Sequence, residues 1–335
     1  MSQSTTSSRA ASPWAVILIA VGVIWLLAQA DIFNSANLSV LFRFWPLILI
    51  AFGLELLVGR NNRQLSLLIV AGTIILLLAL MLIGPSIGLA QTSDVKTAQY
   101  SELLSGADQA SITINANVAN VEINPIADEA NLFDADIDYV GDINFERNGG
   151  EITLESRGNV GISNFFFFDW FGEDLNNVDW NIGINPNVPL NLHVTTGTGG
   201  GRLDLQDLNL TELYVNTGTG SVDMWLPSMD DTYDATYVTG TGGGTITIEE
   251  NADVRLSLRS GTGGMTVDVP EGSAVQVRGS VGTGGIDVPS WLVRVSGGDD
   301  NLVGESGTWE SANFDGAERQ ITIDFNGGTG GLTVR

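Results

Sequence analysis

The chain has 335 residues, no cysteine and a formal net charge of −25, with 39 acidic residues against 14 Lys and Arg. The absence of cysteine excludes disulfides and thiolate metal sites, and the acidic balance argues against nucleic acid as a partner. Residues 1–90 carry four Arg against only two acidic side chains, so nearly all the negative charge lies beyond them. We therefore expect two parts that face different surroundings.

The first ninety residues have the pattern of a membrane region. Residues 1–13 form a Ser/Thr-rich polar tail, which we expect to be disordered. Three apolar segments follow at 14–30, 42–58 and 65–83, with lengths of 17, 17 and 19 residues. Such lengths are typical of membrane helices. We predict a multi-pass transmembrane region of three helices over residues 14–90, in contact with the lipid bilayer.

Basic residues indicate the orientation of this region. Arg9 precedes the first segment, and Arg60 and Arg63 lie between the second and the third. Because basic loops stay on the cytoplasmic side, the amino terminus should be cytoplasmic and everything after residue 90 extracytoplasmic. A competing interpretation has a signal peptidase cut after Ala28-Gln29-Ala30. Two helices then remain in the membrane, and the chain after residue 90 is still extracytoplasmic.

Two charged residues lie within the second apolar segment. Arg43 is near its start, and Glu55 is five residues before Arg60. An ionisable group in a membrane helix is a functional candidate by default. In the alternative interpretation, Glu55 snorkels toward the cytoplasmic arginines and Arg43 anchors the outer interface beside Trp45. Both are kept as candidate intramembrane residues.

After a predicted linker at 91–102, residues 103–335 have the pattern of a β-repeat domain. The first five Gly-Thr-Gly tripeptides recur every 21 or 22 residues, a period that indicates stacked repeats. Alternating apolar and polar runs flank the tripeptides, and glycine allows the positive φ of a tight corner. We predict a parallel β-helix, a β-solenoid of successive coils, with an antiparallel β-sandwich as the alternative. The tripeptides begin at Gly197, Gly218, Gly240, Gly261, Gly282 and Gly328.

The two ends of the β-repeat domain are less regular than its middle. Asn148-Gly149-Gly150 lies between two alternating runs and predicts a hairpin. Regular coils are expected from about residue 180, where the pattern first falls in register with the later repeats. The 46-residue gap between Gly282 and Gly328 holds either two coils, one without the motif, or one coil with an insertion around Trp309–Phe314.

An aromatic run is the most unusual stretch of the domain. Strand alternation would bury only about half of its rings. A large exposed apolar patch indicates contact with the membrane surface or a partner, whereas the alternative is a cap over the open end of the solenoid. The candidate contact residues are Phe165, Phe166, Phe167, Phe168, Trp170 and Phe171.

No stretch predicts catalysis, a cofactor or a bound metal. His193 is the single histidine, so a histidine zinc site or a catalytic triad has no second histidine. Strands follow the glycine tripeptides, whereas phosphate-binding loops need a helix there. Asp204, Asp268 and Asp287 fall near one position of the repeat. They form either a carboxylate column, with cation binding left open, or a solvated outer face. We predict a non-enzymatic protein.

Two stretches resemble known families. The run Phe44-Trp45-Pro46-Leu47-Ile48-Leu49-Ile50-Ala51-Phe52-Gly53 within residues 14–83 resembles the LiaI/LiaF-like transmembrane region. The glycine repeats resemble the toastrack domain found behind such helices in bacterial membrane proteins. Many of those regions carry four helices, whereas this chain shows three.

The resemblance implies a bacterial cell-envelope protein that acts in the stress response. Its role would be that of a regulator, a sensor or a scaffold beside another membrane protein such as a sensor kinase. The competing hypothesis is a membrane-anchored surface module with a structural or adhesive role. Self-association into a homo-oligomer is left open.

Overall fold

The computed structural model describes residues 44–54, 63–87, 95–127, 130–157, 178–297 and 304–335, as well as residues 22, 25, 40, 56 and 57. The chain divides into two units, one of which contains helices while the other contains the described strands.

The helical unit contains α3 (Pro46–Leu54), α4 (Arg63–Ile83) and a short 3₁₀ turn, η2 (Pro85–Ile87). Proline suits the first turn of α3, where its missing N–H costs no intrahelical bond. The two helices coincide with the second and third predicted segments, whereas the first predicted segment, 14–30, lies almost wholly outside the described residues. Within the described ranges, no helix combines the length and apolar character needed to cross a membrane.

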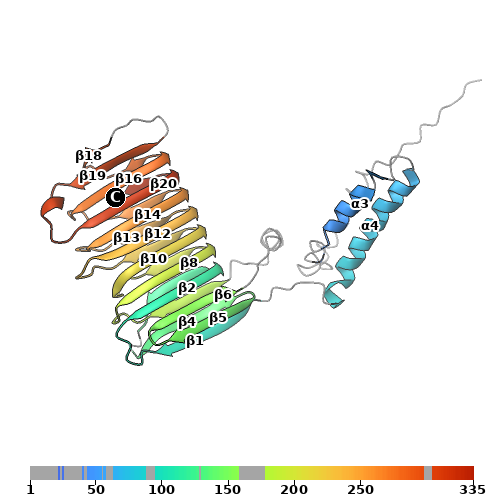
Figure 1. The fold of residues 1–335 in the computed structure, drawn as a ribbon, viewed down its shortest axis with the longest axis horizontal. Coiled ribbons are helices and arrows are strands. Elements are labelled where there is room, and N and C mark those ends of the chain that lie inside the picture. The colour runs from blue at the N-terminus through green and yellow to red at the C-terminus, as the bar shows by residue number, and fades with distance from the viewer. Residues whose placement is uncertain are drawn as a thin grey trace, which may run out of the picture. The chain divides into compact units, whose positions relative to one another are not determined.

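The β unit consists of two sheets, shown in Figure 1. Ten-stranded sheet A contains, in spatial order, β1 (Lys96–Leu103), β4 (Asn131–Tyr139), β7 (Asp179–Ile184), β3 (Asn120–Pro125), β9 (Gly201–Asp204), β11 (Val222–Leu226), β13 (Gly244–Ile248), β15 (Met265–Asp268), β21 (Leu332–Val334) and β17 (Ile286–Asp287). Eleven-stranded sheet B contains β18 (Leu292–Ser296), β19 (Glu305–Ser311), β16 (Val275–Thr283), β20 (Ile321–Thr329), β14 (Val254–Thr262), β12 (Tyr233–Thr241), β10 (Leu210–Thr219), β8 (Leu190–Thr198), β2 (Ala110–Val118), β6 (Glu151–Arg157) and β5 (Asp142–Asn148). A second 3₁₀ turn, η4 (Phe314–Gly316), precedes β20.

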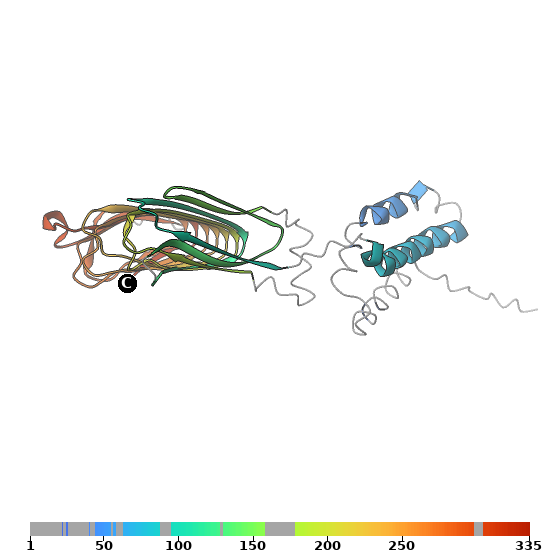
Figure 2. The same cartoon turned by 90° about the horizontal axis from the view of Figure 1, so that it is seen from below.

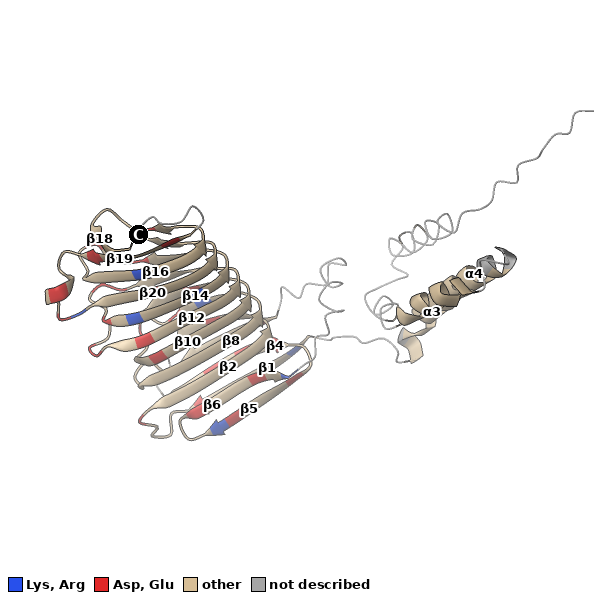
Figure 3. Cartoon of the chain, turned by 45° about the horizontal axis from the view of Figure 1, so that its top comes forward, with Lys and Arg blue, Asp and Glu red and all other residues tan. Residues whose placement is uncertain are grey.

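The sheets pack face to face over one apolar core, as the edge-on view of Figure 2 shows. Every second side chain of a strand points inward. In β8, for example, Leu190, Leu192 and Val194 are buried while His193 is not. Charged residues are few on the strands in the middle of sheet B and more frequent on β5 and β6 (Figure 3). The alternation read from the sequence therefore corresponds to one buried and one solvated face in each sheet.

Most strands pair in parallel, and the chain passes from sheet B to sheet A and back from β8 through β17. Antiparallel pairs occur only near the ends of the sheets, as in β1–β4 and β18–β19. The alternative of an antiparallel sandwich is therefore wrong. Both sheets are open, so the structure gives two facing, mostly parallel sheets, and the β-solenoid itself stays a prediction.

Glycines allow the strands to stack closely at the corner between the two sheets. Gly220 has a φ of +138°, and a Cβ there would lie 1.8 Å from the carbonyl oxygen of Gly199. Gly199, which also has a positive φ, occupies the same place one strand earlier. Each corner thus lies directly against the backbone of the next, and no side chain fits between them. The predicted role of the tripeptides in backbone geometry is confirmed.

The carboxy-terminal strands are not stacked in sequence order. β20 lies between β14 and β16, and Figure 1 shows it there. In sheet A, β21 lies in the same way between β15 and β17. The last pair of strands is therefore inserted between two pairs formed earlier in the chain. The prediction that successive coils stack on one another is wrong at this end, because the 21-residue period gives the length of a repeat and not its neighbour.

The amino-terminal end shows the same insertion. β2 pairs in parallel with both β6 and β8, and β3 pairs in parallel with both β7 and β9. Parallel stacking therefore begins at Ala110, well before the predicted start near residue 180. Residues 96–102, assigned from the sequence to a linker, belong to β1, whose outer positions are polar and whose inner positions include only Ala98 and Tyr100 as apolar residues. This sparse apolar pattern explains why the strand was missed.

The structure also shows the predicted hairpin and the conformation of the chain between Gly282 and Gly328. β5 and β6 pair antiparallel around Gly149, which has a φ of +63°, so the predicted hairpin is confirmed. Between Gly282 and Gly328 the chain forms β18 and β19, which add two antiparallel strands to the edge of sheet B. The insertion around Trp309 is thus the correct one of the two interpretations, and it ends the parallel part of this sheet.

Two buried tyrosines make the β unit less stable at alkaline pH. Tyr233 donates to the carbonyl of Pro227 at 2.9 Å, and Tyr237 donates to that of Gly243 at 2.6 Å. Burial raises the pKa of both phenols above the ordinary value of about 10, and Glu249 adds to the effect at Tyr233. Their contribution to the free energy of unfolding is therefore complete below pH ~10. It is lost as the pH rises, because the tyrosines of the unfolded chain then release phenolic protons that the folded chain keeps.

We expect the free energy of unfolding to fall by about 1.4 kcal/mol per pH unit for each of the two tyrosines above pH ~10. Urea denaturation between pH 9 and pH ~11.5 measures this slope. The double variant Tyr233→Phe/Tyr237→Phe should lose most of it, and an unchanged slope in that variant would assign the alkaline sensitivity to other groups.

Candidate functional site

The residues that the sequence singles out as contacts lie outside the described part of the chain. This applies to Arg43 and Glu55 of the second apolar segment and to Phe165–Phe171. Their roles stay predictions. His193 is described, and its ring stacks on that of Tyr214 at a centroid distance of 4.5 Å on the outer face of sheet B.

Of the two interpretations of Asp204, Asp268 and Asp287, the carboxylate column does not form. Asp204 pairs with Trp225 in the next strand, and Asp287 lies opposite Thr333, in a different row from Asp268. Asp268 instead accepts from the guanidinium of Arg335 at 2.6 Å. Trp225 and Thr247 occupy the positions between Asp204 and Asp268 in one row, and the inserted strand β21 separates Asp268 from Asp287. Among the described residues, no group of three or more Asp, Glu or His is placed to hold a metal ion.

A groove on the outer face of sheet A is the candidate site. It consists of two hollows, of about 430 Å³ and about 310 Å³, which share Asn181 as a lining residue. The larger lies over β1, β4, β7 and β3, and the smaller over β3, β7, β9 and the start of β11. The groove therefore crosses the strands. The groove was not predictable from the sequence, because its walls come from strands that are neighbours in space and not along the chain.

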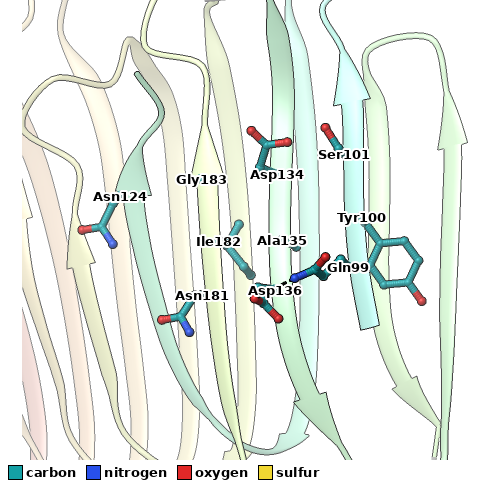
Figure 4. Close-up of a pocket in the computed structure, with 10 residues that line it drawn as sticks. All are labelled: Gln99, Tyr100, Ser101, Asn124, Asp134, Ala135, Asp136, Asn181, Ile182 and Gly183. Carbon is teal, nitrogen blue, oxygen red and sulfur yellow. Dashed lines mark hydrogen bonds between the residues drawn. The ribbon is translucent and has the colours of Figure 1, made fainter. Parts of the chain in front are cut away.

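Alternation along each strand aims polar side chains into this groove. Gln99 lies opposite Asp136, and Asp136 opposite Asn181, so three strands place their side chains in one transverse row. Figure 4 shows Gln99 reaching across to Asp136, with Asn181 and Asn124 beside them. The inward neighbour Tyr100 stacks on Phe145 below the sheet at 4.4 Å. Burial, followed by the nearby Tyr139, raises the pKa of Tyr100.

The carboxylates of the groove are held by neighbouring amides. The donor–acceptor pairs are Gln99 Nε2 to Asp136 at 3.0 Å, Asn120 Nδ2 to Asp179 at 3.1 Å, Asn124 Nδ2 to Glu122 at 3.4 Å and Asn131 Nδ2 to Asp134 at 3.1 Å. Each carboxylate keeps free lone pairs, and the amides of Gln99, Asn120 and Asn124 each keep a second N–H, whereas Asn131 Nδ2 also donates to Ser101. Asn181 makes no side-chain hydrogen bond to any other residue of the described ranges. A ligand would therefore meet acceptors and donors that are already oriented.

One cation lies at the far end of the groove, with a large aromatic ring beside it. Arg202 lines the smaller hollow, and its guanidinium carbon lies 4.7 Å from the ring centroid of Trp225, which is outside the lining. Trp225 is on the outer face of β11, where it is half-buried. The arrangement offers hydrogen-bonding groups and four carboxylates against one guanidinium, but no nucleophile–base pair. Its chemistry suits binding.

Comparison with known families identifies both parts of the chain. Residues 13–92 match the LiaF transmembrane domain, and residues 90–249 match the N-terminal domain of toast_rack. The chain joins a LiaF transmembrane domain to a toast-rack domain. The resemblance read from the sequence is thereby confirmed, and the LiaF domain indicates a membrane protein. Neither domain is a known catalytic domain. The groove lies entirely within the toast-rack match.

Two solved structures show a distant likeness to this chain. A candidate cell adhesion protein from Clostridium sporogenes ATCC 15579 shares 20% identity over 72% of this chain and 99% of its own, with a TM-score of 0.48. A candidate adhesin from Bacteroides fragilis NCTC 9343 shares 11% identity over 73% of this chain and 98% of its own, with a TM-score of 0.29. No curated protein matches the chain.

Proposed function

We propose that this chain is a non-enzymatic, multi-pass regulator or sensor of the bacterial cell envelope, which acts in the envelope stress response. The observation that carries the proposal is the direct succession of a LiaF transmembrane domain and a toast-rack domain in one chain. In this proposal the toast-rack domain, a β-solenoid, faces outward and meets an envelope component. The helices pass its state to another membrane protein such as a sensor kinase.

The exposed surface of the helical unit is apolar, which supports its insertion into a lipid bilayer. Large apolar side chains on α3 and α4 stand exposed, among them Phe52 at 60%, Leu68 at 68% and Ile75 at 66%. Helices that are apolar all round belong in a membrane or in a large core. The arginines before and between the apolar segments favour a cytoplasmic amino terminus and an extracytoplasmic toast-rack domain.

Two predicted contacts complete the proposal. Glu55 would take part in the helical interface, because an ionisable group in a membrane segment needs a partner. The run Phe165–Phe171 would contact the membrane surface or a partner protein, since exposed aromatic patches mark interfaces.

Cross-linking in native membranes, followed by purification, tests the proposal. We expect the full chain to capture a specific membrane protein. A chain with residues 14–90 replaced by an unrelated membrane anchor should lose it. Glu55→Gln should weaken capture, while Glu55→Asp, which keeps the charge, serves as the matched control. If the unrelated anchor captures the same proteins, or no membrane protein is captured at all, the regulator is contradicted and the anchored adhesive module is favoured.

A further inference from the structure

The groove on sheet A has a chemistry that restricts its ligand. Its walls combine amides with carboxylates, and its centre is Asn181, whose amide has no partner in the described part of the chain. A carboxylate only accepts hydrogen bonds, whereas an amide both donates and accepts. A ligand that uses both kinds of group must itself donate and accept at closely spaced points, as neighbouring hydroxyl groups do.

Other ligand classes fit less well. Small-molecule sites are usually concave pockets that bury most of the ligand, whereas this groove is open. Asp134, Asp136, Asp179 and Glu122 would repel an anionic ligand, with only Arg202 to oppose them. A metal ion lacks a set of three Asp, Glu or His among the described residues. A cationic peptide would pair with the carboxylates, and its backbone groups would bond the amide of Asn181. It is therefore the competing ligand, and the charged probes below separate it from a neutral one.

An aromatic ring beside the smaller hollow adds a second feature. Trp225 lies half-buried on the same side of sheet A, next to the lining residue Arg202, whose guanidinium covers one face of its ring at 4.7 Å. A ring of this kind packs against apolar C–H surfaces. Sugar rings combine such a surface with a rim of hydroxyl groups. Because the two hollows run across the strands, the matching ligand is extended.

We propose that this groove binds a neutral glycan, an extended chain of sugar residues that lies across the strands of sheet A from β1 toward Trp225. The proposal rests on the proposed function in one respect, since it takes the toast-rack domain to face the outer envelope. Asn181 is the central contact, with Gln99 and Asn120 on either side of it.

The test uses the full chain in lipid nanodiscs, because the sugar head groups of common detergents would compete for the site. Calorimetry with maltohexaose and with the hexamer of N-acetylglucosamine gives the affinity for two neutral glycans. We expect at least one of them to bind. Asn181→Ala should weaken this binding about three- to tenfold, the usual effect of one lost hydrogen bond. Asn216→Ala, on the outer face of sheet B, is the matched control and should have no effect.

Two further probes separate the glycan from a charged ligand. Asp136→Asn removes one charge but keeps an oxygen that accepts from Gln99, so glycan affinity should change by less than about threefold. Oligogalacturonate should not bind, because the groove carboxylates repel it. Any hexalysine that binds the acidic surface at about 0.15 M salt should bind the wild-type and Asp136→Asn chains equally. Binding of hexalysine that Asp136→Asn weakens would overturn the proposal in favour of a cationic partner.

The glycan proposal would likewise be overturned if neither neutral glycan bound, or if the Asn181→Ala and wild-type chains bound a glycan equally well. Such a result leaves the capture of a membrane partner by the helices untouched. The ligand and the proposed regulatory role therefore fail or succeed separately.

Discussion

Replacing Gly220 by alanine is expected to destabilise the β unit by about 2–6 kcal/mol, and in part of the molecules to prevent folding. The residue has a φ of +138°, which costs a side-chain-bearing residue about 1–3 kcal/mol. The new Cβ would also lie 1.8 Å from the carbonyl oxygen of Gly199, so adjacent corners must separate. Overpacking of this kind adds about 1–3 kcal/mol. Urea denaturation followed by far-ultraviolet circular dichroism measures the loss.

The matched control is Gly264→Ala, in the residue that follows the positive-φ glycine of another corner, Gly263. A Cβ at Gly264 would meet no atom closer than 3.5 Å, and the corresponding place in the corner of Gly220 is already occupied by Ser221. Gly264→Ala should therefore change the free energy of unfolding by less than about 1 kcal/mol. If both variants lose the same stability, the glycines matter for a reason other than the closeness of the corners.

Disulfide cross-linking of introduced cysteine pairs should show that β20 is inserted between β14 and β16, because one pair should cross-link and the other should not. Ser257 of β14 lies opposite Asp324 of β20, and Asp324 lies opposite Arg278 of β16. Neighbouring strands are about 4.8 Å apart, within the Cα range of a disulfide, whereas strands on either side of a third one are about twice as far apart. Under mild oxidation the pair Ser257→Cys/Asp324→Cys should cross-link, and Ser257→Cys/Arg278→Cys should not.

The chain is well suited to this experiment because it contains no cysteine of its own. Non-reducing electrophoresis after proteolysis between the two positions distinguishes the linked from the unlinked chain. The reverse pattern, a link from residue 257 to residue 278 alone, would mean that the strands stack in sequence order and would contradict the insertion. The single variants serve as controls for links between molecules.

Much of the local architecture was predictable because it depends on local rules. The alternation in stretches such as Leu190–Val194 predicts strands with one buried face, and the second glycine of each tripeptide predicts a corner that only glycine can form. These features need only neighbouring residues. The LiaF-like helical segments were readable for the same reason, since apolar length is a local property.

The order of the strands was not predictable from the same information. Ser257 is separated from Asp324 by 67 residues and from Arg278 by 21, yet Asp324 is its neighbour in sheet B. A repeat period states how long each unit is, and the choice between two partners with equivalent patterns depends on how the ends of the sheets pack. The groove depends on that order, so its residues were individually visible as polar outer positions but not as one site.

The inserted strands bear on when this domain can finish folding. In most repeat proteins each unit contacts only the one before it, so structure can grow along the chain and the last unit frays first. Here β21, the last strand along the chain to join the two sheets, pairs with a strand on both sides. The gap between β15 and β17 stays open until residues 332–334 have been synthesised. Strand β21 therefore closes the domain, and its amide hydrogens should exchange as slowly as those of the core.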